Sequence, residues 1–165
     1  IEEEVHNLIE VTLPIMGNEE IKTGLLERPI TSSEDFFNFE TKYMSGGKKG
    51  SGKKGGAKGV HGYSELPAKL SPNLEEQAIK VGKGIYKSLG CRGIARVDML
   101  IDQKSERVYF NEVNPLPGDL YRHNWRAAGV STTDLVSNLV DLAIEAHVSK
   151  TKQNTTFSTN YLKQF

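Results

Sequence analysis

The sequence predicts an α/β fold of the α+β type, in which helices pack on an antiparallel sheet. Two strand-like runs, residues 93 to 101 and 108 to 114, are separated by a short polar loop, as in an antiparallel hairpin. Stretches with helical spacing of apolar residues lie before and after this hairpin. The length of 165 residues, with 37% hydrophobic and 25% charged residues, is typical of one soluble globular domain.

Composition excludes several classes of protein. The 21 basic and 21 acidic residues cancel, so we expect no general attraction to nucleic acid or to anionic membranes. The single cysteine, Cys91, excludes an internal disulfide, the four histidines have no zinc-site spacing, and no apolar run is long enough to span a bilayer. These features predict a cytoplasmic protein. The chain begins without methionine or leader and enters a strand directly, so we expect it to begin inside a larger protein.

The first part of the chain predicts strands and a loop. Residues Leu8 to Met16 are rich in apolar and β-branched side chains and end at the turn signal Gly17-Asn18, which predicts a strand. The aromatic-rich stretch from Phe36 to Tyr43 predicts another. The segment 46–59 holds seven glycines and five lysines and cannot bury enough apolar surface to offset its backbone entropy. It therefore predicts a mobile loop.

Two helices are predicted, one on each side of the hairpin. The first opens at Ser71-Pro72-Asn73, stops at Gly90, and has apolar residues at helical spacing: Leu74, Ala78, Val81, Ile85 and Leu89. Gly82 and Gly84 would be explained by close packing on a sheet. The second runs from about Thr132 to His147, after Ser131 and Asp134 in a capping-box arrangement, and its buried stripe comprises Leu135, Leu139, Leu142 and Ala146.

The hairpin brings four polar residues onto one face of the sheet. A five-residue loop from Gln103 to Arg107 would pair Asp102 with Val108, Leu100 with Phe110, Asp98 with Glu112, and Arg96 with Asn114. Residues two apart in a strand share a face, so the last two pairs form one cluster, while the opposite face is apolar: Ala95, Val97, Met99 and Ile101. The run Pro115 to Gly118 ends the second strand directly after the cluster.

Two facing carboxylates repel each other, so a cation should lie between them. Carboxylate and amide oxygens from Asp98, Glu112 and Asn114 suit Mg²⁺ or Mn²⁺, which typically keep water ligands and bind substrate phosphates. Glu112 lies between the other two and could bridge two such ions. The alternative interpretation is a solvated strand face that carries an Arg–Asp ion pair.

The amino-acid sequence of the hairpin closely resembles that of one protein family. The stretches "CRGIARVDMLID" and "YFNEVNPLPG" resemble the metal-binding hairpin of ATP-grasp enzymes, and among them of D-alanine–D-alanine ligases. The similarity extends upstream, in family order, to "IEVTLPIMGN", "FFNFETKYMSG" and the helix before the hairpin. It covers roughly residues 3 to 148 and implies the carboxyl-terminal ATP-grasp subdomain of such a ligase.

The resemblance assigns roles to individual residues. Asp98 and Glu112 resemble ligands of one Mg²⁺ or Mn²⁺, and Glu112 and Asn114 resemble ligands of the second, with both ions bridging the phosphates of ATP. In the family a substrate carboxylate attacks the γ-phosphoryl group to give an acyl phosphate, and an amino group then displaces phosphate. Arg96 and the backbone N–H of Gly118 resemble the donors that stabilise the tetrahedral oxyanion. A turn after two prolines is the alternative for Gly118.

Other residues match the family's nucleotide site. Glu10 resembles the acidic residue that holds the ribose, and the stretch Glu3, Glu4 to His6 resembles the segment whose backbone meets adenine. Lys42 resembles a phosphate-contacting lysine, and Tyr43 a tyrosine that anchors a loop over the active site. From the residues alone, Glu10 could equally be an exposed strand carboxylate and Tyr43 a core aromatic.

The resemblance implies a partial ATP-grasp domain over 1–148, with residues 44–64 as a mobile loop that closes over the site, and a polar tail over 149–165. A flexible loop with incidental charge is the alternative for 44–64, and the absence of interleaved aromatics argues against nucleic-acid binding there. After Gly118 the family's Ser-rich stretch for the acceptor carboxylate is replaced by "DLYRHNWRAAGVS". Arg122 in this stretch could receive a carboxylate or could be a surface residue.

The resemblance therefore implies an ATP- and Mg²⁺-dependent ligase that joins two D-alanines for peptidoglycan synthesis. Its substrates would be D-alanine and ATP, and the intact protein could be a homodimer. The family's amino-terminal substrate domain and first ATP-binding subdomain lie before the first residue of this sequence, so we expect the isolated chain to be inactive. The alternatives are a carboxylate–amine ligase with another acceptor, and a non-catalytic nucleotide-binding or interaction module.

Overall fold

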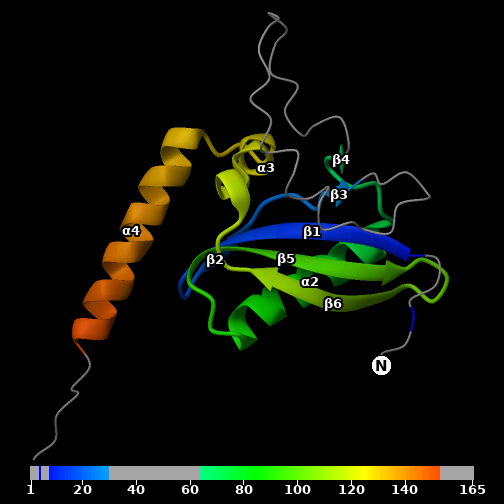
Figure 1. Ribbon diagram of the computed structural model, residues 1–165, viewed down its shortest axis with the longest axis horizontal. Coiled ribbons are helices and arrows are strands. Elements are labelled where there is room, and N and C mark those ends of the chain that lie inside the picture. The colour runs from blue at the N-terminus through cyan, green and yellow to red at the C-terminus, as the bar shows by residue number, and fades with distance from the viewer. Residues whose placement is uncertain (1–3, 5–7, 30–63, 153–165) are drawn as a thin grey trace, which may run out of the picture.

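The computed structural model describes residue 4, residues 8–29 and residues 64–152. Strand β1 (Leu8–Gly17) is followed by β2 (Ile21–Thr23), β3 (Arg28–Pro29), β4 (Ser64–Glu65) and helix α2 (Pro72–Ser88). The hairpin of β5 (Gly93–Asp102) and β6 (Arg107–Asn114) leads into a short 3₁₀ helix, η2 (Gly118–Tyr121), and helices α3 (Arg122–Ala127) and α4 (Thr132–Thr151). The architecture is the predicted mixture of antiparallel sheet and packed helices (Figure 1).

The main sheet has the strand order β2-β1-β5-β6, and all of its neighbouring strands are antiparallel. The central pair is long: β1 and β5 stay in register from Leu8 opposite Asp102 to Gly17 opposite Gly93. A separate two-stranded sheet of β3 and β4 is joined to β1 by a bridge between Thr12 and Glu27. The sheet therefore fixes the positions of side chains on β1, β5 and β6 relative to one another.

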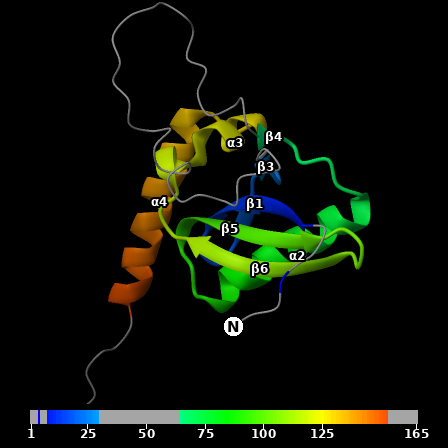
Figure 2. The same ribbon diagram turned by 45° about the vertical axis from the view of Figure 1, so that its right-hand side comes forward.

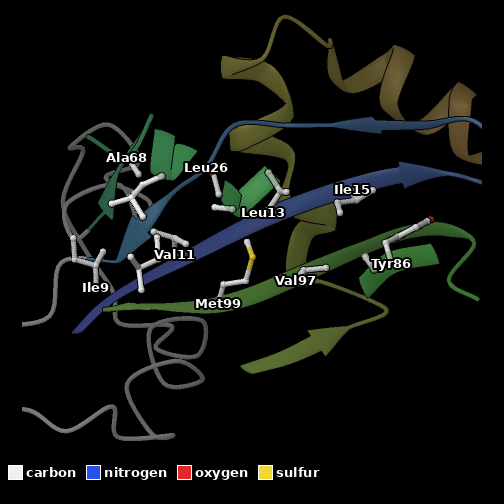
Figure 3. Close-up of a cluster of buried hydrophobic side chains, with 13 residues drawn as sticks. Ile9, Val11, Leu13, Ile15, Leu26, Ala68, Tyr86, Val97 and Met99 are labelled. Atoms are coloured by element: carbon white, nitrogen blue, oxygen red, sulfur yellow. The ribbon is translucent and has the colours of Figure 1, made fainter. Parts of the chain in front are cut away.

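One face of the main sheet forms the hydrophobic core against α2 (Figures 1, 2 and 3). Alternate residues of the two central strands point to this face and are almost fully buried: Ile9, Val11, Leu13 and Ile15 from β1, and Ala95, Val97, Met99 and Ile101 from β5. The predicted apolar face of β5 is thus confirmed. The polar residues of the same strands must lie on the other face, because strand side chains alternate.

Helix α2 begins as predicted, with the Ser71 hydroxyl accepting a hydrogen bond from the Leu74 N–H. The buried stripe of α2 differs in part from the apolar residues at helical spacing, of which Val81 and Ile85 are only partly buried against the core. The residues that α2 buries are spaced four apart, Leu74, Ala78, Gly82 and Tyr86, and Leu89 is 55% exposed. The stripe follows this line because Gly82 lets the helix approach the sheet, where an added Cβ would lie 2.8 Å from the Leu13 side chain. Gly84 faces open space instead, so packing does not explain it.

Helices α3 and α4 form a second apolar cluster at one end of the sheet. Its buried members are Met16, Ile94, Trp125 and Leu135, with Leu139 and Leu142 packed against them. The predicted Ser131 cap of α4 is confirmed, because its hydroxyl accepts a hydrogen bond from the Asp134 N–H. The helix runs past His147 to Thr151, since Val148, Ser149 and Lys150 include no helix breaker and a basic residue suits the last turn. The first residues of the predicted tail are therefore helical.

Some predicted features lie outside the described residues. They are the strand from Phe36 to Tyr43, the loop 46–59 with the rest of 44–63, and the tail beyond 152. Ser64, placed at the end of the predicted loop, belongs to β4, where it lies opposite Pro29. The division of the chain at residue 148 stays a prediction.

Candidate active site on the hairpin of β5 and β6

The hairpin places the four predicted polar residues on one face of the sheet. Asp98 lies opposite Glu112, and Arg96 lies opposite Asn114, as the sequence predicts. All four are on the face turned away from α2, because their neighbour Val97 points into the core. Two carboxylates, one amide and one guanidinium therefore share the end of the hairpin next to the Pro-Leu-Pro-Gly segment.

The predicted pairing nearer the turn is wrong. Phe110 lies opposite Met99, and Arg107, rather than Val108, lies opposite Asp102. A β-bulge shifts the register between Asp98 and Met99, and the turn is one residue shorter than predicted, with Glu106 in a left-handed conformation at φ 52°. The bulge turns Val108 and Phe110 to the apolar side of the sheet while it keeps the polar end in place.

Arg96 and Asp98 form a bidentate ion pair. The Arg96 Nε and Nη2 atoms each donate a hydrogen bond of 2.7 Å, to Oδ1 and Oδ2 of Asp98 respectively. The Asp98 side chain is fully buried, and that of Arg96 is 14% exposed. Burial alone would lower the pKa of Arg96, but the hydrogen bonds and negative charge of Asp98 outweigh it and raise this pKa above its usual value. Arg96 is therefore a fixed positive charge next to the proposed metal ligands.

Glu112 and Asn114 complete the oxygen-rich end of the hairpin. Glu112 is exposed on the edge strand β6, and Asn114 is partly buried. The Asn114 Oδ1 accepts a hydrogen bond of 3.0 Å from the Leu116 N–H, so the amide is oriented by the turn that follows β6. A carbonyl oxygen has a second lone pair for a cation. The donor set of two facing carboxylates and one amide oxygen thus fits Mg²⁺ or Mn²⁺.

Within the described part of the chain, no cluster of three or more His, Cys, Asp and Glu side chains could hold a metal ion. The candidate site on the hairpin has two carboxylates, Asp98 and Glu112. Mg²⁺ commonly relies on one or two carboxylates and takes its other ligands from water and substrate phosphates.

Gly118 begins the turn that follows the hairpin. It is exposed, and a Cβ built on it would meet no heavy atom within 4 Å. As the first residue of η2, it has an N–H group that lacks an acceptor within the helix. These features agree with a backbone donor that faces a substrate.

The segment after Gly118 returns to the polar face of the sheet. Tyr121 donates or accepts a hydrogen bond of 3.1 Å with the Thr12 hydroxyl, and Thr12 lies opposite Asp98. The Arg96 guanidinium carbon lies 5.4 Å from the centre of the Tyr121 ring. Burial raises the pKa of the Tyr121 hydroxyl well above its usual range, and the negative charge of Glu27 adds to this effect.

A buried polar network around Glu27 holds the residues that follow Tyr121. Glu27 is 4% exposed, and its Oε2 lies 2.8 Å from Nε2 of His123 and 3.3 Å from Nδ2 of Asn124. Burial alone would raise the pKa of Glu27, but hydrogen bonds from His123, Ser64 and Asn124 lower it below its usual value. The sequence prediction missed Glu27, Thr12 and Asn124, because the partner of each residue lies about 100 positions away in the chain.

The nucleotide-binding predictions are described only in part. Glu10 lies on β1 opposite Leu100 and two residues from Thr12, so it shares the polar face with the hairpin cluster. Glu4 is exposed. Glu3, His6, Lys42 and Tyr43 lie outside the described residues. The structure therefore places Glu10 on the same face of the sheet as Arg96, Asp98, Glu112 and Asn114, but nearer the turn of the hairpin.

Comparison with known proteins identifies the family to which this chain belongs. A family model described as "D-ala D-ala ligase C-terminus" matches residues 1–141. This chain belongs to that family. D-alanine–D-alanine ligase B of Clostridium tetani is 35% identical over 146 residues, which cover 86% of this chain and 37% of the relative. D-alanine–D-alanine ligase A of Escherichia coli K12 is 31% identical over 151 residues, which cover 89% of this chain and 37% of the relative. The chain thus spans less than two fifths of the length of these relatives.

Solved structures of ligases have the same fold. A D-alanine–D-alanine ligase of Coxiella burnetii superposes with a TM-score of 0.67 at 22% identity, covering 92% of this chain and 36% of that one. The VanG D-Ala:D-Ser ligase of Enterococcus faecalis superposes with a TM-score of 0.63 at 27% identity, covering 86% and 37%. The predicted ATP-grasp fold is confirmed. In the described part of the chain, no helix has the length and apolar character needed to cross a membrane.

Proposed function

We propose that this chain forms the metal-binding and oxyanion-stabilising part of an ATP-dependent ligase that joins two D-alanines for peptidoglycan synthesis. One observation carries the proposal: Asp98 faces Glu112 and Arg96 faces Asn114 on the polar face of the hairpin, in a member of the ligase family. A solvated strand face is a poorer account, because Asp98 is fully buried in the midst of it.

Asp98, Glu112 and Asn114 would hold two Mg²⁺ or Mn²⁺ ions, with Glu112 shared between them. When bound, such ions neutralise negative charge on the phosphates of ATP during phosphoryl transfer. Glu10 would hold the ribose, the backbone of Glu3 to His6 would meet adenine, and Lys42 would contact phosphate. Tyr43 would anchor the segment 44–64 over the site, which would exclude water from an intermediate that hydrolyses readily.

The reaction follows from the chemistry of a carboxylate and an amine. An oxygen of the first D-alanine carboxylate attacks the γ-phosphorus of ATP, the bond to the β-phosphate oxygen breaks, and ADP leaves. The amino group of the second D-alanine attacks the acyl phosphate, and a negative charge develops on the acyl oxygen. Arg96 and the Gly118 N–H would stabilise that charge, because donors held in place before the reaction need no reorganisation. The attacking nitrogen gives up a proton to solvent, phosphate leaves, and an amide remains.

A ligase with a different acceptor is the second candidate. The segment after Gly118 has Asp119, Tyr121, Arg122 and His123 where the resemblance leads us to expect a Ser-rich stretch. Arg122 is half exposed and paired with Asp119 at 3.0 Å, so it is a surface ion pair in this structure rather than a preformed carboxylate site. One structural relative is described as a D-Ala:D-Ser ligase, which makes D-serine an acceptor to include in any assay.

The deciding experiment is an assay of a polypeptide that has the length of the ligase relatives and contains this chain. Phosphate release and the mass of the amide product should be measured with Mg-ATP, D-alanine and a panel of second amino acids. The proposal predicts phosphate release that depends on D-alanine and a D-alanyl-D-alanine product. Turnover only with another acceptor would favour the second candidate, and Mg-ATP binding without any product would leave a nucleotide-binding module. A cytoplasmic location and a homodimer are proposed for the same intact protein.

A further inference from the structure

Three adjacent residues after Gly118 have left-handed backbone conformations. Their φ and ψ angles are 51° and 28° for Asp119, 50° and 21° for Leu120, and 54° and 34° for Tyr121. None of them is glycine, and side chains with a Cβ disfavour this region of the backbone map. Such strain persists only where surrounding contacts over-determine it, and it is often found at functional sites. The contacts made by Tyr121 show what this segment accomplishes.

The left-handed run turns the chain back so that Tyr121 lies over the polar face of the hairpin. Its hydroxyl is held at 3.1 Å by the Thr12 hydroxyl, on the strand next to Asp98. Its ring centre lies 5.4 Å from the Arg96 guanidinium carbon, within the range of a cation–π interaction. Tyr121 is therefore attached to β1 at one end and contacts β5 with its ring.

The Tyr121 ring also contacts the ring of His123. The His123 ring lies 4.6 Å from it, centre to centre, and tilted by 57°. His123 is in turn fixed by Glu27, which is joined to the backbone of Thr12 by hydrogen bonds of 2.8 and 3.0 Å. The position of the Tyr121 ring is thus set by contacts with three separate parts of the chain, so it has little freedom to leave Arg96.

We propose that Tyr121 is a positioning residue for Arg96, which it holds beside the reacting acyl group without neutralising its charge. The inference rests on the proposed function, in which Arg96 stabilises the oxyanion. Asp98 is the charged partner of Arg96, but its oxygens are also the proposed metal ligands. A carboxylate in place of the ring would offset the positive charge that the oxyanion needs. An aromatic ring attracts the guanidinium through its quadrupole and leaves the net charge of the site unchanged.

The placement can be tested by NMR on the 165-residue chain, with the Nε–Hε resonance of Arg96 as the probe. Loss of one signal in Arg96→Lys identifies the resonance. Ring current from Tyr121 should shift the proton upfield, Tyr121→Phe should keep most of that shift, and Tyr121→Leu should remove it. The matched control is Phe110→Leu, which removes an exposed ring on the opposite face of the same hairpin. An Arg96 proton at the same position in the wild type and in Tyr121→Leu would overturn the inference.

The same variants should then be assayed in the ligase at the length of its relatives. Tyr121→Leu should lower kcat for D-alanine-dependent phosphate release by about 10- to 100-fold while KM for ATP changes less than about twofold. Tyr121→Phe should stay within about threefold of the wild type, because it keeps the ring. Phe110→Leu should match the wild type.

The outcomes separate the two proposals. A large loss in Arg96→Lys together with a normal kcat in Tyr121→Leu would overturn the positioning role alone. Normal turnover in Arg96→Lys would overturn the assignment of Arg96 on which the proposed function depends. Equal losses in Tyr121→Phe and Tyr121→Leu would show that the hydroxyl rather than the ring matters, and would also overturn the inference.

Discussion

Replacing Asn124 by alanine should destabilise the fold through the segment that carries Tyr121. The Asn124 side chain is fully buried. Its Oδ1 accepts a hydrogen bond from the Leu25 N–H and its Nδ2 donates one to the Leu25 carbonyl, both at 2.9 Å. Nδ2 also donates to Oε2 of Glu27 at 3.3 Å. One amide therefore joins α3 to the segment 24–27, which pairs with β1 through backbone hydrogen bonds.

The magnitude follows from these three bonds. Each backbone bond contributes about 1 kcal/mol, and the bond to the Glu27 carboxylate contributes about 1.5 kcal/mol. Truncation leaves the Leu25 groups and the carboxylate short of partners, so the expected loss is about 3 to 4 kcal/mol. That is a large share of a domain stability of about 5 to 15 kcal/mol. With a urea slope of about 2 kcal/mol/M, the midpoint should fall by about 1.5 to 2 M.

Urea unfolding followed by Trp125 fluorescence would measure the effect, because Trp125 is the only tryptophan and is 1% exposed. The matched control is Asn73→Ala, since Asn73 is exposed and makes one long contact of 3.4 Å with Glu106. Its stability should change by less than about 0.5 kcal/mol. Midpoints for Asn124→Ala and Asn73→Ala that coincide would refute the reasoning about the buried amide.

Three further changes have distinct expected outcomes. In a polypeptide that has the length of the ligase relatives and contains this chain, Glu112→Gln should reduce ATP turnover by more than about 100-fold. Thermal unfolding should be nearly unchanged, because Glu112 is an exposed edge-strand residue. Turnover within a few-fold of the wild type would contradict the metal role. Gly82→Ala should lower the free energy of unfolding by about 1 to 2 kcal/mol, because the new Cβ would meet the Leu13 side chain. Gly84→Ala should raise it by about 0.5 to 1 kcal/mol, because its Cβ meets nothing and alanine favours a helix. A change of the same sign in both variants would contradict this reasoning. The pKa of Glu27 is lower in the folded than in the unfolded protein, so the ionised carboxylate stabilises the fold above pH 4.5, and this stabilisation is lost as the pH falls below that value. The difference in the free energy of unfolding between wild type and Glu27→Gln, measured in urea, should therefore become smaller in acid. A difference that does not change with pH would contradict this reasoning.

The sequence predicted the elements whose signals are local. The Ser71 and Ser131 caps, the alternation of β5, and the pairing of Asp98 with Glu112 depend on spacing within one element or one hairpin. The buried line of α2 was harder to predict, because it depends on how closely Gly82 approaches a strand about 70 residues earlier in the chain. The bulge in β6 was missed for a related reason. In a strand without a bulge, Val108 would lie on the same face as Glu112, whereas the bulge lets Val108 pack against the core.

The site was predictable where it follows the hairpin and not where it depends on tertiary contacts. Arg96 and Asp98 appear in the sequence as alternate residues, so their shared face could be deduced. The contact of Tyr121 with Thr12 joins residues 109 positions apart. The left-handed backbone that permits it could not be predicted, because the residues that adopt it are not glycines. Glu27 likewise reads as a surface carboxylate until the fold buries it against His123.

The central claim is that the hairpin carries the groups for ligation through an acyl phosphate. The most direct measurement uses D-alanine labelled with ¹⁸O in its carboxylate, with mass spectrometry of the phosphate released by the ligase at the length of its relatives. If a carboxylate oxygen attacks the γ-phosphorus, one labelled oxygen should appear in the released phosphate, and Glu112→Gln should abolish the transfer together with the turnover. Unlabelled phosphate released alongside D-alanyl-D-alanine would contradict the account.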